Sequence, residues 1–173
     1  MFVLGHLGIG GGAAAHFVDA RERRFLYFGA LLPDLIDKPL YYALVLLTGR
    51  RGADLGLISG SRTLGHTALL ALLILALFRR RHGPAIALGM ATHLALDTLG
   101  DLFGFFSSPH AGPAGPSTLA AVLFPLLGPQ FPVAPFQSFG EHALSIASPY
   151  VLAGELIGGA LLLWQWQKQR RPQ

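Results

Sequence analysis

The sequence predicts an all-α membrane protein: a polytopic bundle of about five spans with a proline-rich re-entrant or interfacial loop. Of its 173 residues, 52% are hydrophobic and only 13% are charged, whereas a soluble domain carries about 25% charged residues. Apolar runs of helical length alternate with short basic clusters, as is typical of membrane spans and their connections. The length suits one compact bundle, so residues 1–173 are expected to form a single integral membrane domain.

The expected helices follow the apolar runs. The first run, Phe2–Ala20, is glycine-rich and predicts a helix retained in the mature protein, because it lacks the basic flank of a cleaved signal peptide. The second run, Phe25–Thr48, contains the segment Pro33-Asp34-Leu35-Ile36-Asp37-Lys38-Pro39. Two prolines among three charges predict a broken helix whose freed backbone groups are buried in protein or line a wet cavity. Further helices are expected at about Thr63–Phe78, Pro84–Phe106 and Ala143–Trp166.

The helices of residues 1–106 are separated from the C-terminal helix, residues 142–167, by a proline-rich loop at 107–141. If the N-terminus lies outside, the basic clusters at 21–24, 79–82 and 168–171 fall on the cytoplasmic side of an inner membrane, as the positive-inside rule prefers. Arg50, Arg51 and Arg62 then lie outside, against that rule. The net charge of +4 and the pI near 10.0 are therefore attributed to topology and headgroup contacts, and no nucleic-acid partner is expected.

Ionisable residues within the apolar helix at 84–106 are the strongest functional signal. His93 and Asp97 lie four residues apart, so they share one helix face and can converge on one ion, and Asp101 lies a further turn along. A charged group in hydrocarbon costs on the order of 3 kcal/mol, so such residues usually face a protein interior, pair with each other or do chemistry. Two alternatives remain open: Asp97 orienting a ligand histidine from behind, and a satisfied buried histidine.

Two carboxylates precede this pair in the sequence. Asp34 and Asp37, at i and i+3, are close enough to bind one ion or to bridge two. In the alternative, Asp34 caps a helix restarted after Pro33, and Asp37 pairs with Lys38 or Arg62.

Histidines and an arginine complete the candidate set. Arg62 and His66 lie one turn apart at a predicted helix start, where a guanidinium and a helix N-terminus both favour phosphate; headgroup-level residues are the alternative. His6 and His16 are about 15 Å apart along one helix, so both serve one ion only if the helix breaks at residues 8–12. Because the chain has no cysteine, nitrogen and oxygen ligands favour zinc, with manganese or iron possible and one or two ions.

Three motifs taken together resemble those of the YdjM-type family of membrane-bound metal-dependent hydrolases. They are Pro33-Asp34-Leu35-Ile36-Asp37, Arg62-Thr63-Leu64-Gly65-His66-Thr67 and His93-Leu94-Ala95-Leu96-Asp97, preceded by His6 or His16. The resemblance covers residues 1 to about 105 and implies metal ligation by Asp34, Asp37, His66, His93 and Asp97. The chain departs from the family pattern at Ser61 and Lys38, where histidines are common. The ligand order is also distantly similar to that of zinc-dependent phospholipase C.

The sequence thus predicts a membrane-embedded hydrolase in which a metal activates water. The metal ligands are expected to be Asp34, Asp37, His66, His93, Asp97 and His6. Asp101 is expected to take the proton of the water and Arg62 to hold a phosphate, and a site among lipids suggests a lipid or lipid-linked phosphoester. The competing hypothesis is a non-enzymatic membrane protein in which the same groups handle ions or protons or tie helices together.

Overall fold

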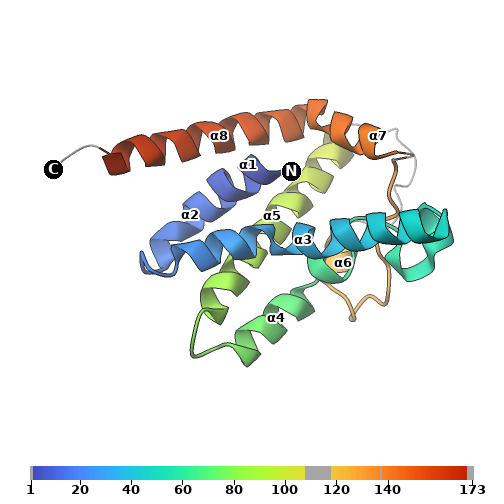
Figure 1. The fold of residues 1–173 in the computed structure, drawn as a ribbon, viewed down its shortest axis with the longest axis horizontal. Helices are drawn as coiled ribbons and strands as arrows, with labels where there is room; N and C mark the ends of the chain where they lie inside the picture. The colour runs from blue at the N-terminus through green and yellow to red at the C-terminus, as the bar shows by residue number, and fades with distance from the viewer. Residues whose placement is uncertain (1, 108–117, 137, 171–173) are drawn as a thin grey trace.

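The computed structural model describes residues 2–107, 118–136 and 138–170, and over these ranges it contains helices and no strands. The chain is therefore all-α, as predicted. Figure 1 shows the long helices α3 and α5 crossing at the centre, with α8 along one side and α4 along the other. Residues 108–117 and 137 of the predicted proline-rich loop lie outside the described residues.

The N-terminal run is helical, but it is not one uniform α-helix. It consists of α1 (Val3–Gly5), a π-helix (His6–Gly11), α2 (Gly12–Ala14) and a 3₁₀ turn (Ala15–Phe17). In the π-helix the Gly12 N–H donates to the Leu7 carbonyl, five residues back. Such wide turns occur mostly at functional sites, and this one begins at a candidate ligand.

Helix α3 (Arg23–Thr48) corrects the prediction of a broken helix. It runs without a break through Pro33 and Pro39 and ends where Gly49 adopts a left-handed conformation. Each proline withholds one N–H from the helical ladder, but tertiary partners hold the segment in place. Asp37 is fully buried against the 63–66 turn, and Lys38 pairs with Asp34 one helical turn away.

Helices α4 (Ala68–Leu77) and α5 (Gly83–Ser107) form a hairpin beside α3. Two 3₁₀ turns, Gly52–Ile58 and Leu64–His66, connect α3 to α4, so the helix predicted at 63–78 is interrupted at Thr67, whose hydroxyl accepts from Leu70 N. At the crossing of α3 and α5, a Cβ added to Gly89 would lie 2.1 Å from the Leu26 carbonyl oxygen. The two backbones are therefore in contact, which fixes the distance between the ligands that they carry.

The C-terminal third contains α6 (Thr118–Val122), α7 (Phe139–Leu144), a 3₁₀ turn (Ser145–Ala147) and α8 (Pro149–Arg170). The predicted helix at 143–166 thus divides at Ser148, and α8 extends to residue 170. Helix α8 packs on the N-terminal run: a Cβ on Gly8 would lie 2.0 Å from the Gly158 carbonyl oxygen.

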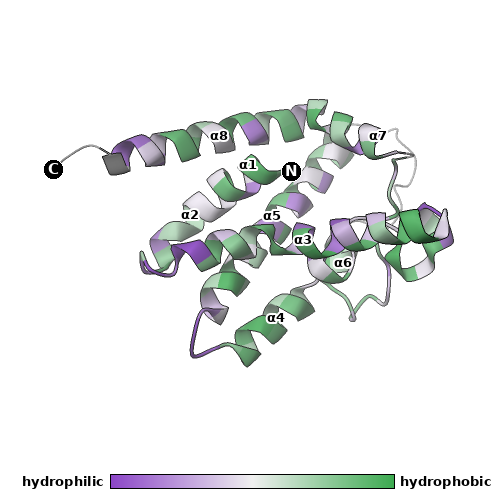
Figure 2. Cartoon of the chain, in the orientation of Figure 1, coloured by the Kyte–Doolittle hydropathy of each residue, from purple (hydrophilic) through white to green (hydrophobic). Residues whose placement is uncertain are grey.

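Within the described residues, no helix taken singly has both the length and the apolar character needed to cross a membrane; the helical segments Phe139–Ala147 and Pro149–Lys168 have them only jointly, with a 73° bend between them. The exterior is nevertheless apolar. Figure 2 shows hydrophobic residues along α4 and over much of α8. Large hydrophobic side chains are exposed throughout, among them Leu46, Leu72, Phe106, Leu126, Leu156 and Leu163. The buried hydrophobic core is small by comparison and is centred on Leu26, where α3 and α5 meet the N-terminal run.

Candidate metal centre

Three side chains from two elements converge in the interior. His66, in the 3₁₀ turn before α4, and His93, in α5, bring their Nε2 atoms to 3.1 Å from each other. The Asp97 Oδ2 atom lies 3.5 Å from the first nitrogen and 3.7 Å from the second. All three residues are buried. The structure therefore brings together the His93–Asp97 pair and His66, as the sequence predicts.

Asp34 and His6 complete the cluster from two other elements. The Asp34 Oδ1 atom lies 3.7 Å from His66 Nε2 and 4.0 Å from His93 Nε2. The His6 ring stacks on the His93 ring with centroids 3.7 Å apart, and its Nε2 lies 3.4 Å from Asp97 Oδ1. His6, Asp34 and His93 thus form a second group of possible ligands, which overlaps the first at His93.

The distances among His66, His93 and Asp97 fit three ligands of a tetrahedral ion. Ligands about 2.0–2.1 Å from zinc in tetrahedral geometry lie roughly 3.3 Å from one another. The distances among His66, His93 and Asp97 are 3.1, 3.5 and 3.7 Å, and Asp34 is only slightly farther away. Two imidazoles and two carboxylates form a donor set typical of zinc, manganese or iron.

The hydrogen bonds at the far side of each ring decide which atoms face the centre. His93 Nδ1 lies 2.7 Å from the Ala30 carbonyl oxygen, which can only accept, so Nδ1 carries the hydrogen. His66 Nδ1 lies 2.8 Å from Asp37 Oδ2, so the same assignment holds there. In the neutral rings both Nε2 atoms are then bare acceptors, and they face each other and two carboxylates. A cation between these acceptors, either a proton or a metal ion, would remove the repulsion between the two nitrogen lone pairs.

Asp37 stands behind His66 and belongs to neither group of possible ligands. Besides His66 Nδ1, its carboxylate accepts from Thr63 N, Thr63 Oγ1, Gly65 N and His66 N. These bonds fold the 63–66 turn around the carboxylate and hold the His66 ring. The arrangement is that of a carboxylate that orients a metal-binding histidine.

Arg62 and Asp101 form a chain of polar contacts leading away from the centre. The Arg62 Nε atom lies 3.0 Å from Asp97 Oδ2, and its Nη1 atom donates to Asp101 Oδ1 and Thr118 Oγ1. Asp101 Oδ2 accepts from Thr118 N. Burial by itself lowers the pKa of Arg62, but the charges of Asp97 and Asp101 outweigh it and raise that pKa. Asp101 thus positions the guanidinium.

A cavity of about 160 Å³ opens onto this centre. Asp34, Asp97, Lys38, Arg62 and His142 supply its ionisable wall, and Asp101 is not among the lining residues. Its remaining lining is mainly apolar and comes from the N-terminal run, the 132–136 segment and α8: Phe2, Pro132, Val133, Ala134, Pro135, Phe136 and Val151. The cavity therefore combines two cations with an apolar rim.

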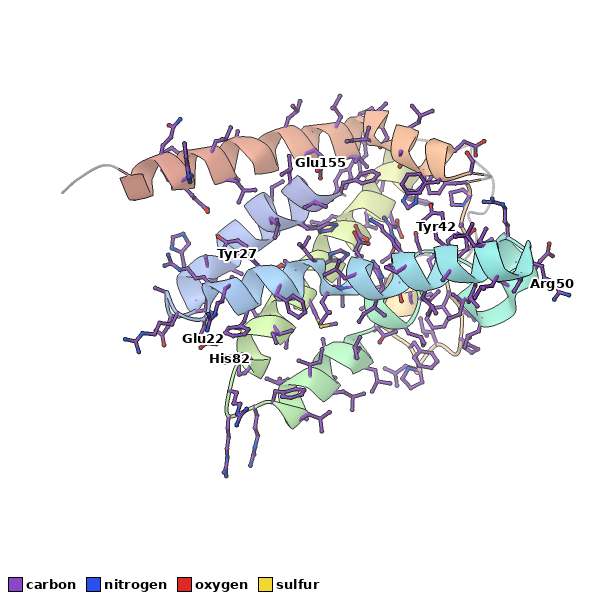
Figure 3. All side chains as sticks on the ribbon, in the orientation of Figure 1. Glu22, Tyr27, Tyr42, Arg50, His82 and Glu155 are labelled. Atoms are coloured by element: carbon purple, nitrogen blue, oxygen red, sulfur yellow. The ribbon has the colours of Figure 1, made fainter. Side chains whose placement is uncertain are left out.

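Glu155 of α8 holds the N-terminal end of the chain, a role that the sequence did not reveal. Its carboxylate accepts from the N–H groups of Phe2, Leu4 and Gly5, each at 2.9 Å. Figure 3 shows Glu155 between α8 and the N-terminal run. A carboxylate at a helix N-terminus satisfies the free N–H groups and offsets their partial positive charge. Glu155 thereby fixes the first turn, which leads directly into His6.

The choice between His6 and His16 is resolved by the fold. His6 is fully buried in the cluster, whereas His16 is exposed in a separate hollow beside Glu22 and Arg81. His82, which pairs with Glu22, lies with it at the opposite end of α3 from Tyr42 and Arg50 (Figure 3). The placement of His142 on the cavity wall escaped sequence reasoning because it depends on tertiary packing. The Lys38–Asp34 pair is local to α3, at i and i+4, whereas the sequence suggested Asp37 as the partner of Lys38.

Comparison with protein-family models, with curated proteins and with solved structures found no match to this chain.

Proposed function

We propose that this protein is a membrane-embedded, metal-dependent hydrolase of phosphoesters, with lipid or lipid-linked substrates. One observation carries the proposal. The Nε2 atoms of His66 and His93 lie 3.1 Å apart without a hydrogen between them in the neutral rings, and carboxylate oxygens of Asp97 and Asp34 lie beside them. A proton shared between the rings would relieve only one pair of acceptors. A divalent cation satisfies all four, and zinc is the ion whose usual ligand types and spacing agree best.

The chain's own residues have separate roles in this proposal. His66, His93, Asp97 and Asp34 hold the ion, Asp37 and the Ala30 carbonyl orient the two imidazoles, and His6 contacts the outer oxygen of Asp97. A divalent ion held there supplies a nucleophile at neutral pH by lowering the pKa of a coordinated water. A second ion near His6 and direct ligation by Asp37 stay predictions, as does the resemblance to the YdjM-type family.

The cavity supports an anionic substrate. Arg62 is 32% exposed and Lys38 is 26% exposed, and both line the wall next to the ligand carboxylates. Arginine offers phosphate a planar fork of donors and lysine offers a compact charge. The apolar rim around them favours an ester that carries a hydrocarbon group. A general-base role for Asp101 stays a prediction, since its oxygens contact Arg62 and Thr118.

The apolar exterior supports a membrane location. Leu46, Leu126 and Phe106 are exposed by 85%, 84% and 75%, respectively, and soluble proteins rarely expose large contiguous apolar patches. Asp37 of α3 and His93 and Asp97 of α5 lower the hydropathy of these helices but face the interior of the bundle, at the proposed metal centre. Neither α7 nor the connection that carries Arg62 forms part of the long helices α3, α5 and α8.

The experiment that tests the proposal is elemental analysis of detergent-purified protein, beside a His93→Ala, Asp97→Ala double variant. We expect one or two equivalents of zinc or manganese in the wild type and none in the variant. His82→Ala serves as the control, because His82 lies at the far end of α3 and pairs with Glu22.

Protein that carries metal is then assayed with p-nitrophenyl phosphate, bis-p-nitrophenyl phosphate and a short-chain phosphatidic acid. Metal-dependent release of phosphate or nitrophenol supports the hydrolase. No metal in either protein, even after reconstitution, would overturn the proposal in favour of a non-enzymatic membrane protein with buried ion pairs.

A further inference from the structure

His142 of α7 lies far along the sequence from the residues of the metal centre, but it lines the same cavity as Asp34 and Asp97. Its Nδ1 atom is 2.5 Å from the Tyr42 hydroxyl oxygen, and Phe136 stacks on its ring at 4.6 Å with the planes within 5°. Phe2 packs against the ring with centroids 5.8 Å apart. Three elements thus hold one half-buried imidazole in a fixed orientation.

The other ionisable groups on this wall are already engaged. Lys38 pairs with Asp34, and Arg62 pairs with Asp97. Asp34 and Asp97 are also candidate metal ligands. Among the described lining residues, His142 is the one ionisable side chain that has neither a role at the ion nor an ion-pair partner in the structure. It is therefore the group whose proton is free to exchange with a substrate.

We propose that His142 is the general base of the hydrolysis, an inference that rests on the function proposed above. Its Nε2 atom takes a proton from the attacking water as the oxygen of that water bonds to phosphorus. The bond from phosphorus to the ester oxygen breaks, and the leaving oxygen keeps the electron pair. The proton then passes from Nε2 to that oxygen, so the imidazole returns to its neutral form with each turnover.

The protonation state of His142 suits this role. Burial lowers its pKa, and the charges of Lys38 and Arg62 add to this effect, while Asp34 opposes it. These groups face His142 from α3 and from the connection before α4, and Tyr42 of α3 is its hydrogen-bonding partner. Because the pKa is lowered, the neutral ring that accepts a proton predominates at pH 7, and it is lost only as the pH falls.

Tyr42 acts as a positioning residue. When the Nδ1 hydrogen of His142 is donated to the Tyr42 oxygen, the lone pair lies on Nε2. The same bond stabilises the imidazolium that forms when Nε2 takes the proton, as the partner of a catalytic histidine usually does.

The test uses full-length protein in detergent, with metal content measured for every variant and p-nitrophenyl phosphate as the probe. For His142→Ala we expect full metal occupancy and a fall in kcat of about 10²–10³-fold, the usual contribution of a general base. When kcat is expressed per bound metal at each pH, the acidic limb that is present in the wild type should disappear, and added imidazole should restore part of the rate. Tyr42→Phe should shift that limb and lower kcat about 10-fold or less, and His82→Ala should change neither.

An alkyl phosphate sharpens the test, because an alkoxide needs the returned proton more than nitrophenolate does. The deficit of His142→Ala should therefore be larger with the alkyl ester. A metal-loaded His142→Ala protein with unchanged kcat and an unchanged acidic limb would overturn the inference and leave the hydrolase standing. A wild type that binds no metal or hydrolyses no probe would overturn both.

Discussion

Asp37 shows how a residue that is not itself a proposed ligand can control a metal site through a ligand that it contacts. Five hydrogen bonds converge on its carboxylate, four of them from the 63–66 turn and one from the His66 ring. A carboxylate suits this position because both of its oxygens accept hydrogen bonds and neither carries a hydrogen to donate; three of the contacts fall on Oδ2 and two on Oδ1. An asparagine side chain has the same shape, but its N–H₂ group would point hydrogens at the N–H and O–H donors of residues 63–66.

Asp37→Asn should therefore weaken metal binding by about 10–100-fold, the usual effect of losing the partner that orients a metal-binding histidine. Titration of the metal-free protein with zinc, followed by calorimetry, measures the change. Asp34→Asn is the matched comparison, because it alters a proposed ligand instead of a supporting group. If Asp37→Asn binds zinc as tightly as the wild type, Asp37 does not orient His66.

At the scale of elements, close contacts between backbones set the spacing of the ligands. Helices α3 and α5 meet at Gly29 and Gly89, where an added Cβ would lie 2.1 Å from a carbonyl oxygen of the other helix. His93 lies one turn after Gly89 on α5, and its Nδ1 contact to the Ala30 carbonyl spans the same crossing. If the two helices moved apart, His93 would lose its hydrogen bond to the Ala30 carbonyl, and its ring would no longer be held in this orientation.

Gly89→Ala should destabilise the protein by roughly 1–3 kcal/mol through overpacking and should also reduce metal occupancy. Gly104→Ala on the same helix is the control, because no atom lies within 4 Å of its added Cβ. It should raise stability by up to about 1 kcal/mol, since alanine favours helix over glycine. Thermal unfolding in detergent and elemental analysis measure both effects. Equal stability and metal occupancy of the two variants would contradict the close contact between α3 and α5 at Gly89.

Glu155 connects α8 to the N-terminal run in the same way. Glu155→Gln removes the charge and turns one amide N–H₂ toward backbone donors, so we expect a loss of roughly 2 kcal/mol and weaker zinc binding through His6. Glu22→Gln, which alters a partly exposed pair with His82, should cost under about 0.5 kcal/mol. Thermal unfolding measures the stability of both variants. If Glu155→Gln were as stable as Glu22→Gln, the hydrogen bonds from Glu155 to the first backbone N–H groups would not stabilise the fold.

At the scale of the whole molecule, a bound ion should stabilise the fold, because its proposed ligands come from three elements: α3, the 63–66 turn and α5. Zinc at about 100 times its Kd should stabilise the folded state by about 2.7 kcal/mol, or roughly 5–10 °C in Tm for a chain of this size. A chelator should reverse the shift. Histidine ligands must be neutral to bind, so the shift should decline as the pH falls. If neither zinc nor a chelator changed the Tm at pH 7.5, stabilisation of the fold by a bound ion would be excluded.

The sequence predicted the parts of this architecture that depend on local pattern. The placement of His93 and Asp97 on one face follows from helix geometry and from the cost of burying charge in an apolar chain. The grouping of Asp34, His66 and His93 in one site was expected from the resemblance of their motifs to those of the YdjM-type family. The continuity of α3 through Pro33 and Pro39 was missed, because the contacts that hold this segment come from residues 60–66 and from α5. The partners of Glu155 and the wall position of His142 were missed for the same reason, since each contact spans 100 residues or more.

The π-helix at His6–Gly11 gives the N-terminal run a particular angular phase. A wide turn of this kind is equivalent to one residue more than an α-helix needs over the same length. Deleting Gly10 would restore the α phase and rotate every preceding residue by about 100° about the axis. The extra residue thus sets the rotation of this N-terminal end relative to α2, so that its first amides reach Glu155 while the His6 ring stacks on His93.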